Sequence, residues 1–169
     1  KTSMDTLLSD LKQLTKVGLS LSVVFSSVAG YLLAVDVINY TTLLLLALGG
    51  FFMVGASNAF NQIIERDTDA LMLRTKNRPL PTGRMSVNLA MTIAVLFTIS
   101  GLSILYSINP KTALFGAISI FLYTSVYTPL KSVTPLTVFV GAIPGAIPFM
   151  LGWVAATNQF GIEAGMLFM

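Results

Sequence analysis

The chain has 169 residues, of which 54% are hydrophobic and only 10% are charged, and its mean hydropathy is +0.81. A soluble domain typically carries about 25% charged residues, so this composition argues against a water-soluble globule. Cysteine and histidine are both absent, which removes disulfides, thiol chemistry, a histidine general base and the usual zinc ligands. Any metal site built from this sequence must use oxygen ligands, which favours magnesium or calcium.

Five apolar stretches approach the length of about 20 residues that a membrane helix needs. A further apolar run from Ala164 to Met169 is expected to begin a sixth span, and Pro144 and Pro148 are expected to kink the fifth. The predicted fold class is therefore all-α: a polytopic transmembrane helical bundle of about five spans plus the start of a sixth. In chain order the predicted spans are Val17–Val35, Thr41–Ile64, Val87–Ile108, Thr112–Tyr127 and Leu136–Ala156.

The two ends of the chain indicate a piece of a longer protein. The sequence starts at Lys1 rather than at a methionine, and it stops inside the last apolar run. The polar opening from Lys1 to Lys16 shows no signal-peptide cleavage pattern. We therefore expect residues 1–169 to be the N-terminal part of one membrane domain.

The basic residues are distributed unequally between the two faces that the five spans define. Nine of the ten lie before span one, between spans two and three, or between spans four and five, and only Lys111 lies on the other face. Because cytoplasmic loops are enriched in lysine and arginine, this pattern places the N-terminus on the cytoplasmic or matrix side. A bacterial inner membrane and a mitochondrial inner membrane fit the pattern equally well.

The longest polar stretch, residues 61–84, follows span two directly. Asn61, Glu65 and Asp69 are spaced i, i+4 and i+8, so a continuing α-helix would align their side chains along one face. Two carboxylates one turn apart repel each other. A Mg²⁺ ion between them would attract both, and it could also bind the oxygens of a phosphate. Arg78, downstream, is suited to bind a phosphate with two parallel hydrogen bonds. A solvated loop whose acids and bases neutralise each other explains the same charges equally well.

A second group of residues is predicted on the same membrane face. Tyr123 and Tyr127 end span four, and Pro129 disfavours helix at the residue before it. Lys131 then lies at the mouth of the bundle, with the Tyr127 hydroxyl beside it. Taken alone, these residues are better explained as an interfacial aromatic belt with a lysine on the positive side.

The combined pattern resembles the UbiA-type intramembrane prenyltransferases. The resemblance rests on Asn61-xxx-Glu65-xxx-Asp69 followed by the stretch from Lys76 to Arg84, Lys-Asn-Arg-Pro-Leu-Pro-Thr-Gly-Arg. Three further stretches resemble the haem-farnesylating branch of that family: residues 14–16, Tyr127-xxx-Lys131 and residues 141–148. The resemblance covers nearly the whole chain. Two features depart from the family pattern: Val17 stands where proline is usual, and the chain ends before a second acidic motif, so we expect it to be inactive alone.

The resemblance implies a reaction and roles for individual residues. Farnesyl diphosphate and haem B would be the substrates, the farnesyl group being transferred to a haem vinyl group, and Mg²⁺ would be held by Asn61, Glu65, Asp69 and the second motif. Arg78 and Lys131 would stabilise the leaving diphosphate, with a hydrogen bond from Tyr127. The further residues expected to bind substrate are Lys16, Arg66, Lys76, Arg84 and Tyr123.

Two other functions stay open from the sequence. One is a related prenyltransferase that acts on a quinone precursor, an aromatic acid or a chlorophyllide. The other is a small-solute transporter lined by the polar residues of the kinked fifth span, although a transporter should place ionisable residues near the membrane centre. We expect the lipid bilayer to be a partner and nucleic acid not to be one; the sequence leaves the oligomeric state open.

Overall fold

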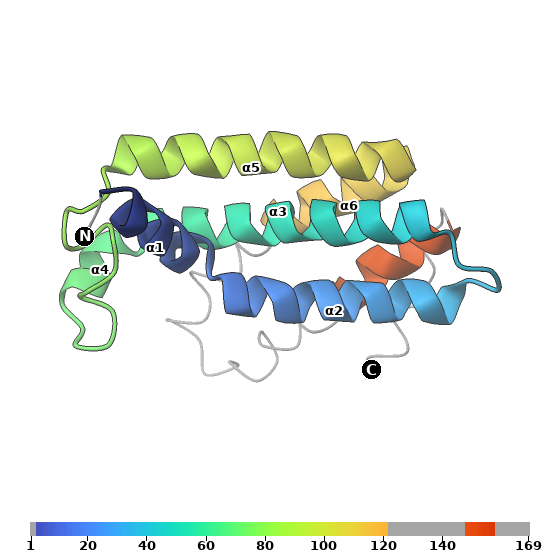
Figure 1. The fold of residues 1–169 in the computed structure, drawn as a ribbon, viewed down its shortest axis with the longest axis horizontal. Helices are drawn as coiled ribbons and strands as arrows, with labels where there is room; N and C mark the ends of the chain where they lie inside the picture. Colours follow the sequence, from blue (N-terminus) through green and yellow to red (C-terminus); the bar gives the residue numbers. More distant parts are fainter. Residues whose placement is uncertain (1–2, 122–147, 158–169) are drawn as a thin grey trace.

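The computed structural model describes residues 3–121 and 148–157. All the secondary structure within these ranges is helical. Figure 1 shows α2, α3 and α5 along the length of the molecule, with α3 between the other two, against which it packs. The labelled helices are α1 (Ser3–Thr15), α2 (Val17–Ala34), α3 (Tyr40–Ile64), α4 (Arg66–Ala70), α5 (Val87–Ile108) and α6 (Pro110–Phe121), and the helix Pro148–Thr157 follows.

Three of the predicted spans are confirmed as helices that are long and apolar enough to cross a membrane. These are α2, α3 and α5, whose bounds lie within one residue of the predicted ones, and none of them contains a charged residue. The predicted fourth and fifth spans fall only partly in the described residues, as α6 and Pro148–Thr157, so the count of five stays a prediction. Pro148 is the first described residue of its helix, and Pro144 lies outside the described residues.

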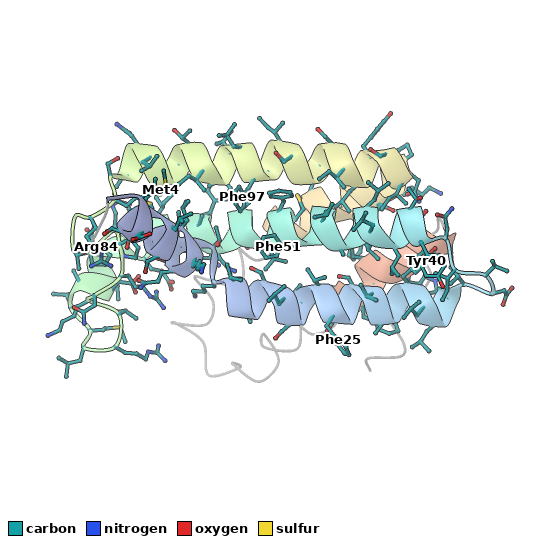
Figure 2. All side chains as sticks on the ribbon, viewed as in Figure 1. Met4, Phe25, Tyr40, Phe51, Arg84 and Phe97 are labelled. Atoms are coloured by element: carbon teal, nitrogen blue, oxygen red, sulfur yellow. The ribbon has the colours of Figure 1, made fainter. Side chains whose placement is uncertain are left out.

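Glycines allow α3 and α5 to approach closely. A Cβ atom on Gly101 of α5 would lie 2.6 Å from the sulfur of Met53 on α3, which is closer than real Cβ atoms come. Two aromatic rings complete this contact, since the Phe52 and Phe97 centroids are 5.0 Å apart with the rings perpendicular. In Figure 2, Phe97 points from α5 toward α3, whereas Phe25 points outward from α2 and is 76% exposed. The apolar side chains on the outside of the bundle are suited to face lipid.

The two ends of the bundle differ in charge. α1, α4 and the segment that leads to α5 lie at one end, and the connections from α2 to α3 and from α5 to α6 lie at the other (Figure 1). Among the charged residues that the structure describes, only Asp36 and Lys111 belong to the second end. The charged end therefore contains those acidic and basic candidate site residues that lie within the described part of the chain.

A separate apolar cluster anchors the charged end. Leu80 and Met85 from the segment before α5 are only 8% and 3% exposed, so this segment is packed onto the helices rather than free in solvent. Ser86 then caps α5 by accepting a hydrogen bond from the backbone N–H of Leu89 at 3.1 Å. The cluster consists of Leu14, Ala59, Ile63, Leu80, Met85, Ala90 and Ala94.

Candidate functional site: an acidic turn beside a cationic hollow

The predicted acidic stripe lies where α3 passes into α4. The prediction of one continuous helix was wrong, because α3 ends at Ile64 and Glu65, with φ −93° and ψ 6°, separates it from α4. Helical hydrogen bonds nevertheless run through the break, from Glu65 N to Asn61 O at 2.9 Å and from Asp69 N to Glu65 O at 2.8 Å. The three residues therefore keep the one-turn spacing that the sequence predicts.

Asp69 is buried and is paired with Arg78. The Asp69 side chain is 6% exposed, and Arg78 donates from a terminal guanidinium nitrogen to its carboxylate at 2.9 Å. Thr75 fixes the intervening turn by donating its hydroxyl to the Asp69 carbonyl at 2.9 Å. A buried carboxylate needs a compensating cation, and in this structure the guanidinium is that cation.

A hollow of about 510 Å³ lies beside this ion pair. Three of the residues that line it, Lys12, Lys16 and Arg78, carry positive charge, and Gln62 adds an amide. Arg78 connects the acidic stripe to the hollow, because it pairs with Asp69 of the stripe and also lines the hollow. A hollow with this lining is suited to an anion with several oxygens, because each cation can donate hydrogen bonds to it. The residues of the described ranges that line it are Ser9, Lys12, Gln13, Lys16, Val17, Gly18, Leu19, Gln62 and Arg78.

Other residues selected from the sequence have different surroundings. Arg84 donates from Nε to the buried carboxylate of Asp10 on α1 at 3.0 Å and from a terminal nitrogen to the Asn77 carbonyl at 2.8 Å, so it joins α1 to the segment before α5. Arg66 donates to the carbonyl of Ile63 at 2.6 Å, and Lys76 is exposed. That these three residues bind substrate remains a prediction.

Three predicted site residues, Tyr123, Tyr127 and Lys131, lie outside the described residues. The roles that the sequence assigns to them therefore stay predictions.

Sequence reasoning missed two groups of residues at this end. One is Lys12, which lies four residues before Lys16. It lines the hollow and is positively charged, as Lys16 and Arg78 are. The other is an amide pair on α3, Asn58 and Gln62, which are 6% and 1% exposed. The available signal was the spacing of that pair, since two amides at i and i+4 inside an apolar span indicate a polar contact with another segment.

The donor chemistry of the stripe fits a hard divalent cation. Asn61, Glu65 and Asp69 present only oxygen to such an ion, and Asp69 is already neutralised by a cation. Within residues 3–121 and 148–157, no group of three acidic, cysteine or histidine side chains is arranged to hold a metal ion. A stripe of two carboxylates and one amide would therefore form part of a metal site rather than all of it.

Comparison with known proteins gives consistent results. The chain is 72% identical over 164 residues to a protoheme IX farnesyltransferase of Flavobacterium psychrophilum, and the match covers 95% of this chain and 55% of that protein. The chain thus spans about half the length of the curated relatives it matches. The sequence profile of the UbiA prenyltransferase family matches residues 23–169.

Two solved structures share the fold. A digeranylgeranylglyceryl phosphate synthase has a TM-score of 0.83 and 23% identity, covering 95% of this chain and 57% of that one. A UbiA homolog from Archaeoglobus fulgidus, bound to DMAPP and Mg²⁺, has a TM-score of 0.77 and 22% identity, covering 94% and 59%. At these identities the likeness concerns the fold, and the family match concerns most of the sequence. This chain is an integral membrane protein that belongs to the UbiA prenyltransferase family.

Proposed function

We propose that this chain is the N-terminal part of a Mg²⁺-dependent prenyltransferase that transfers a farnesyl group from farnesyl diphosphate to a vinyl group of haem B, giving haem O. The observation that carries the proposal is the 72% identity to a protoheme IX farnesyltransferase. The solved relative that binds DMAPP and Mg²⁺ supports a prenyl diphosphate and a divalent ion as ligands of this fold. The whole protein resides in a bacterial inner membrane, or in the mitochondrial inner membrane, with the charged end on the cytoplasmic or matrix side.

The residues of the charged end have complementary tasks in this proposal. Asn61, Glu65 and Asp69 would hold Mg²⁺, which neutralises the diphosphate and so makes it a better leaving group. Arg78 leaves Asp69 for the diphosphate and, together with Lys16, donates hydrogen bonds to its oxygens. These contacts strengthen as negative charge develops on the leaving group, which is the condition for lowering the barrier.

The reaction itself conserves charge and atoms. The bond between the farnesyl carbon and the diphosphate oxygen breaks, and its electron pair leaves with the diphosphate. The haem vinyl group attacks the allylic cation through its π electrons, water adds to the resulting cation, and a proton is released to solvent. Apolar helix walls such as those of α2, α3 and α5 keep water from the allylic cation before the haem captures it.

The test uses the full-length protein, purified with Mg²⁺ and farnesyl diphosphate, and mass spectrometry of the products. One reaction contains haem B and the other an aromatic acid. We expect the haem to gain the mass of a farnesyl group plus a hydroxyl group, and we expect no prenylated aromatic acid. Prenylation of the aromatic acid alone would overturn the proposed acceptor while leaving the family assignment intact.

A matched pair of variants tests the assigned residues in the same assay. Glu65→Gln and Asp67→Asn each remove one negative charge from neighbouring positions, but only Glu65 belongs to the predicted stripe, and Asp67 is exposed. We expect Glu65→Gln to abolish product formation and Asp67→Asn to retain it. Equal activity of the two variants would exclude the role assigned to Glu65.

A further inference from the structure

The elbow between α1 and α2 has an unusual backbone. Lys16, the residue between the two helices, has φ 51° and ψ 64°, and it is the only non-glycine residue with positive φ in the described ranges. A side chain in this left-handed region is disfavoured, so such a residue persists only when its surroundings hold it there. Lys16 also lines the cationic hollow. The contacts that hold the elbow therefore determine where the Lys16 ammonium group lies.

Those contacts come from the amide pair on α3. Gln62 donates from Nε2 to the backbone carbonyls of Gln13 at 2.8 Å and Leu14 at 3.3 Å. Asn58 donates from Nδ2 to the carbonyl of Thr15 at 2.8 Å. The last carbonyls of a helix have no partner within it, so these bonds satisfy the end of α1 and fasten it to α3.

One atom of this arrangement has no partner among the described residues. Gln62 Oε1 is buried without a hydrogen bond from the described residues, and Gln62 lines the same hollow as Lys16. A buried acceptor without a partner is unfavourable and is rare in folded proteins. The position of Gln62 thus connects it to the hollow as well as to the helix end.

The same stretch of α3 supports the acidic side of the site. Asn61 follows Asn58 on α3, and Asp69 of the next helix pairs with Arg78, which lines the same hollow as Lys16. α3 therefore supports two groups at the charged end: the carboxylates that follow it and the elbow with Lys16, which its amides contact.

We propose that Asn58 and Gln62 are positioning residues, which hold Lys16 in its left-handed turn so that its ammonium group lies in the hollow that Arg78 also lines. The inference rests on the proposed function, because the ligand that both cations would bind is the diphosphate. Neither amide needs to touch the substrate. Their effect on diphosphate binding would pass entirely through the position of Lys16.

The first measurement is independent of any ligand. Hydrogen exchange followed by mass spectrometry is recorded on the full-length protein, comparing the wild type with Gln62→Met and Asn58→Ala. Asn58→Ala is the gentler variant, because Ser20 Oγ still donates to the Thr15 carbonyl at 2.9 Å. We expect exchange of residues 16–20 to be at least about threefold faster in each variant, with α5 unchanged. Unchanged exchange in this segment would overturn the inference.

The second measurement separates positioning from a purely structural role. Binding of inorganic pyrophosphate with Mg²⁺ is measured for the wild type, Gln62→Met, Lys16→Met and the double variant; where Gln62→Met does not fold, Asn58→Ala replaces it. We expect Gln62→Met to weaken binding by about tenfold, and to have no further effect once Lys16 is replaced, because coupled residues are not additive. Equal effects in both backgrounds, or no effect, would refute a role through Lys16.

Asn39→Ala is the matched control. Asn39 caps the opposite end of α3 by accepting from Thr42 N at 3.1 Å, so its loss loosens the same helix far from the hollow. The control should exchange faster only near its own site and bind pyrophosphate like the wild type; weaker binding in Asn39→Ala would show that general loosening, not Lys16, sets the affinity. Farnesylation of haem B by the wild type is assayed separately. If it fails while pyrophosphate binds, the proposed acceptor is wrong and the test of Lys16 still stands.

Discussion

The ion pair between Arg78 and Asp69 gives the sharpest prediction about the charged end. Arg78→Gln removes the cation that compensates a carboxylate only 6% exposed, while keeping a polar but uncharged side chain at this position. At 2.9 Å and an effective dielectric constant of about 20, the attraction amounts to about 6 kcal/mol before desolvation is counted. Removing one partner of a fully buried pair costs about 3–5 kcal/mol, and because Arg78 is 24% exposed we expect a smaller loss.

We therefore expect Arg78→Gln to lower the free energy of unfolding by about 2 kcal/mol in the presence of EDTA, roughly a 30-fold change in the unfolding equilibrium. If Glu65 and Asp69 bind a divalent cation, Mg²⁺ should restore most of this loss, because one cation then replaces the other. Denaturant unfolding of the full-length protein in detergent, with EDTA and with Mg²⁺, measures both effects.

Arg84→Gln is the control for this experiment. Arg84 donates to Asp10, whose side chain is likewise 6% exposed, at 3.0 Å, so the geometry of the two pairs is nearly the same. Asp10 does not belong to the stripe, and Mg²⁺ should leave the Arg84→Gln loss unchanged. Two results would refute the reasoning: an Arg78→Gln protein as stable as the wild type in EDTA, or equal rescue of both variants by Mg²⁺.

Further predictions concern the stripe and the helix packing. Asp69→Asn should abolish haem farnesylation while the protein stays folded, since the amide still accepts a hydrogen bond from Arg78; circular dichroism and product analysis check this, and retained turnover would remove Asp69 from the metal site. Gly101→Val should destabilise the protein by about 1–3 kcal/mol, because its side chain would overlap Met53, and thermal unfolding measures the loss. Gly18→Ala is its control, since a Cβ there meets nothing within 4 Å; equal destabilisation of both would contradict the packing argument.

The spans could be predicted because long apolar runs have charged or turn-forming residues at their ends. Val87–Ile108 has the predicted bounds, and α2 ends one residue earlier than predicted, where Val35 is already extended. Burial of apolar side chains in lipid depends on length and composition, which a sequence displays directly. The break at Glu65 could not be predicted in this way, because no glycine or proline marks it.

The site could be predicted only where its residues are close in sequence. The spacing of Asn61, Glu65 and Asp69 is local, and the hydrogen bonds through the α3–α4 break preserve it. The pairing of Arg84 with Asp10 joins residues 74 positions apart, and no local pattern distinguishes that arginine from Arg78. Tertiary packing thus decides which cation faces the acidic stripe and which one fastens α1.

The contacts around Lys16 also join segments that are far apart in the sequence, so local patterns could not predict them. The family resemblance predicts that Lys16 binds substrate, but its left-handed backbone depends on amides more than 40 positions away in the chain. In the sequence, Asn58 and Gln62 are two polar residues inside an apolar span. Only the structure shows that they donate hydrogen bonds to the end of α1.

The most direct test of the metal site is a crystal structure of the full-length protein with Mn²⁺ in place of Mg²⁺ and an unreactive farnesyl diphosphate analogue. We predict an anomalous peak within about 2–2.5 Å of carboxylate oxygens of both Glu65 and Asp69, with Arg78 turned from Asp69 to the diphosphate. A peak remote from these carboxylates, with Asp69 still paired to Arg78, would contradict the account.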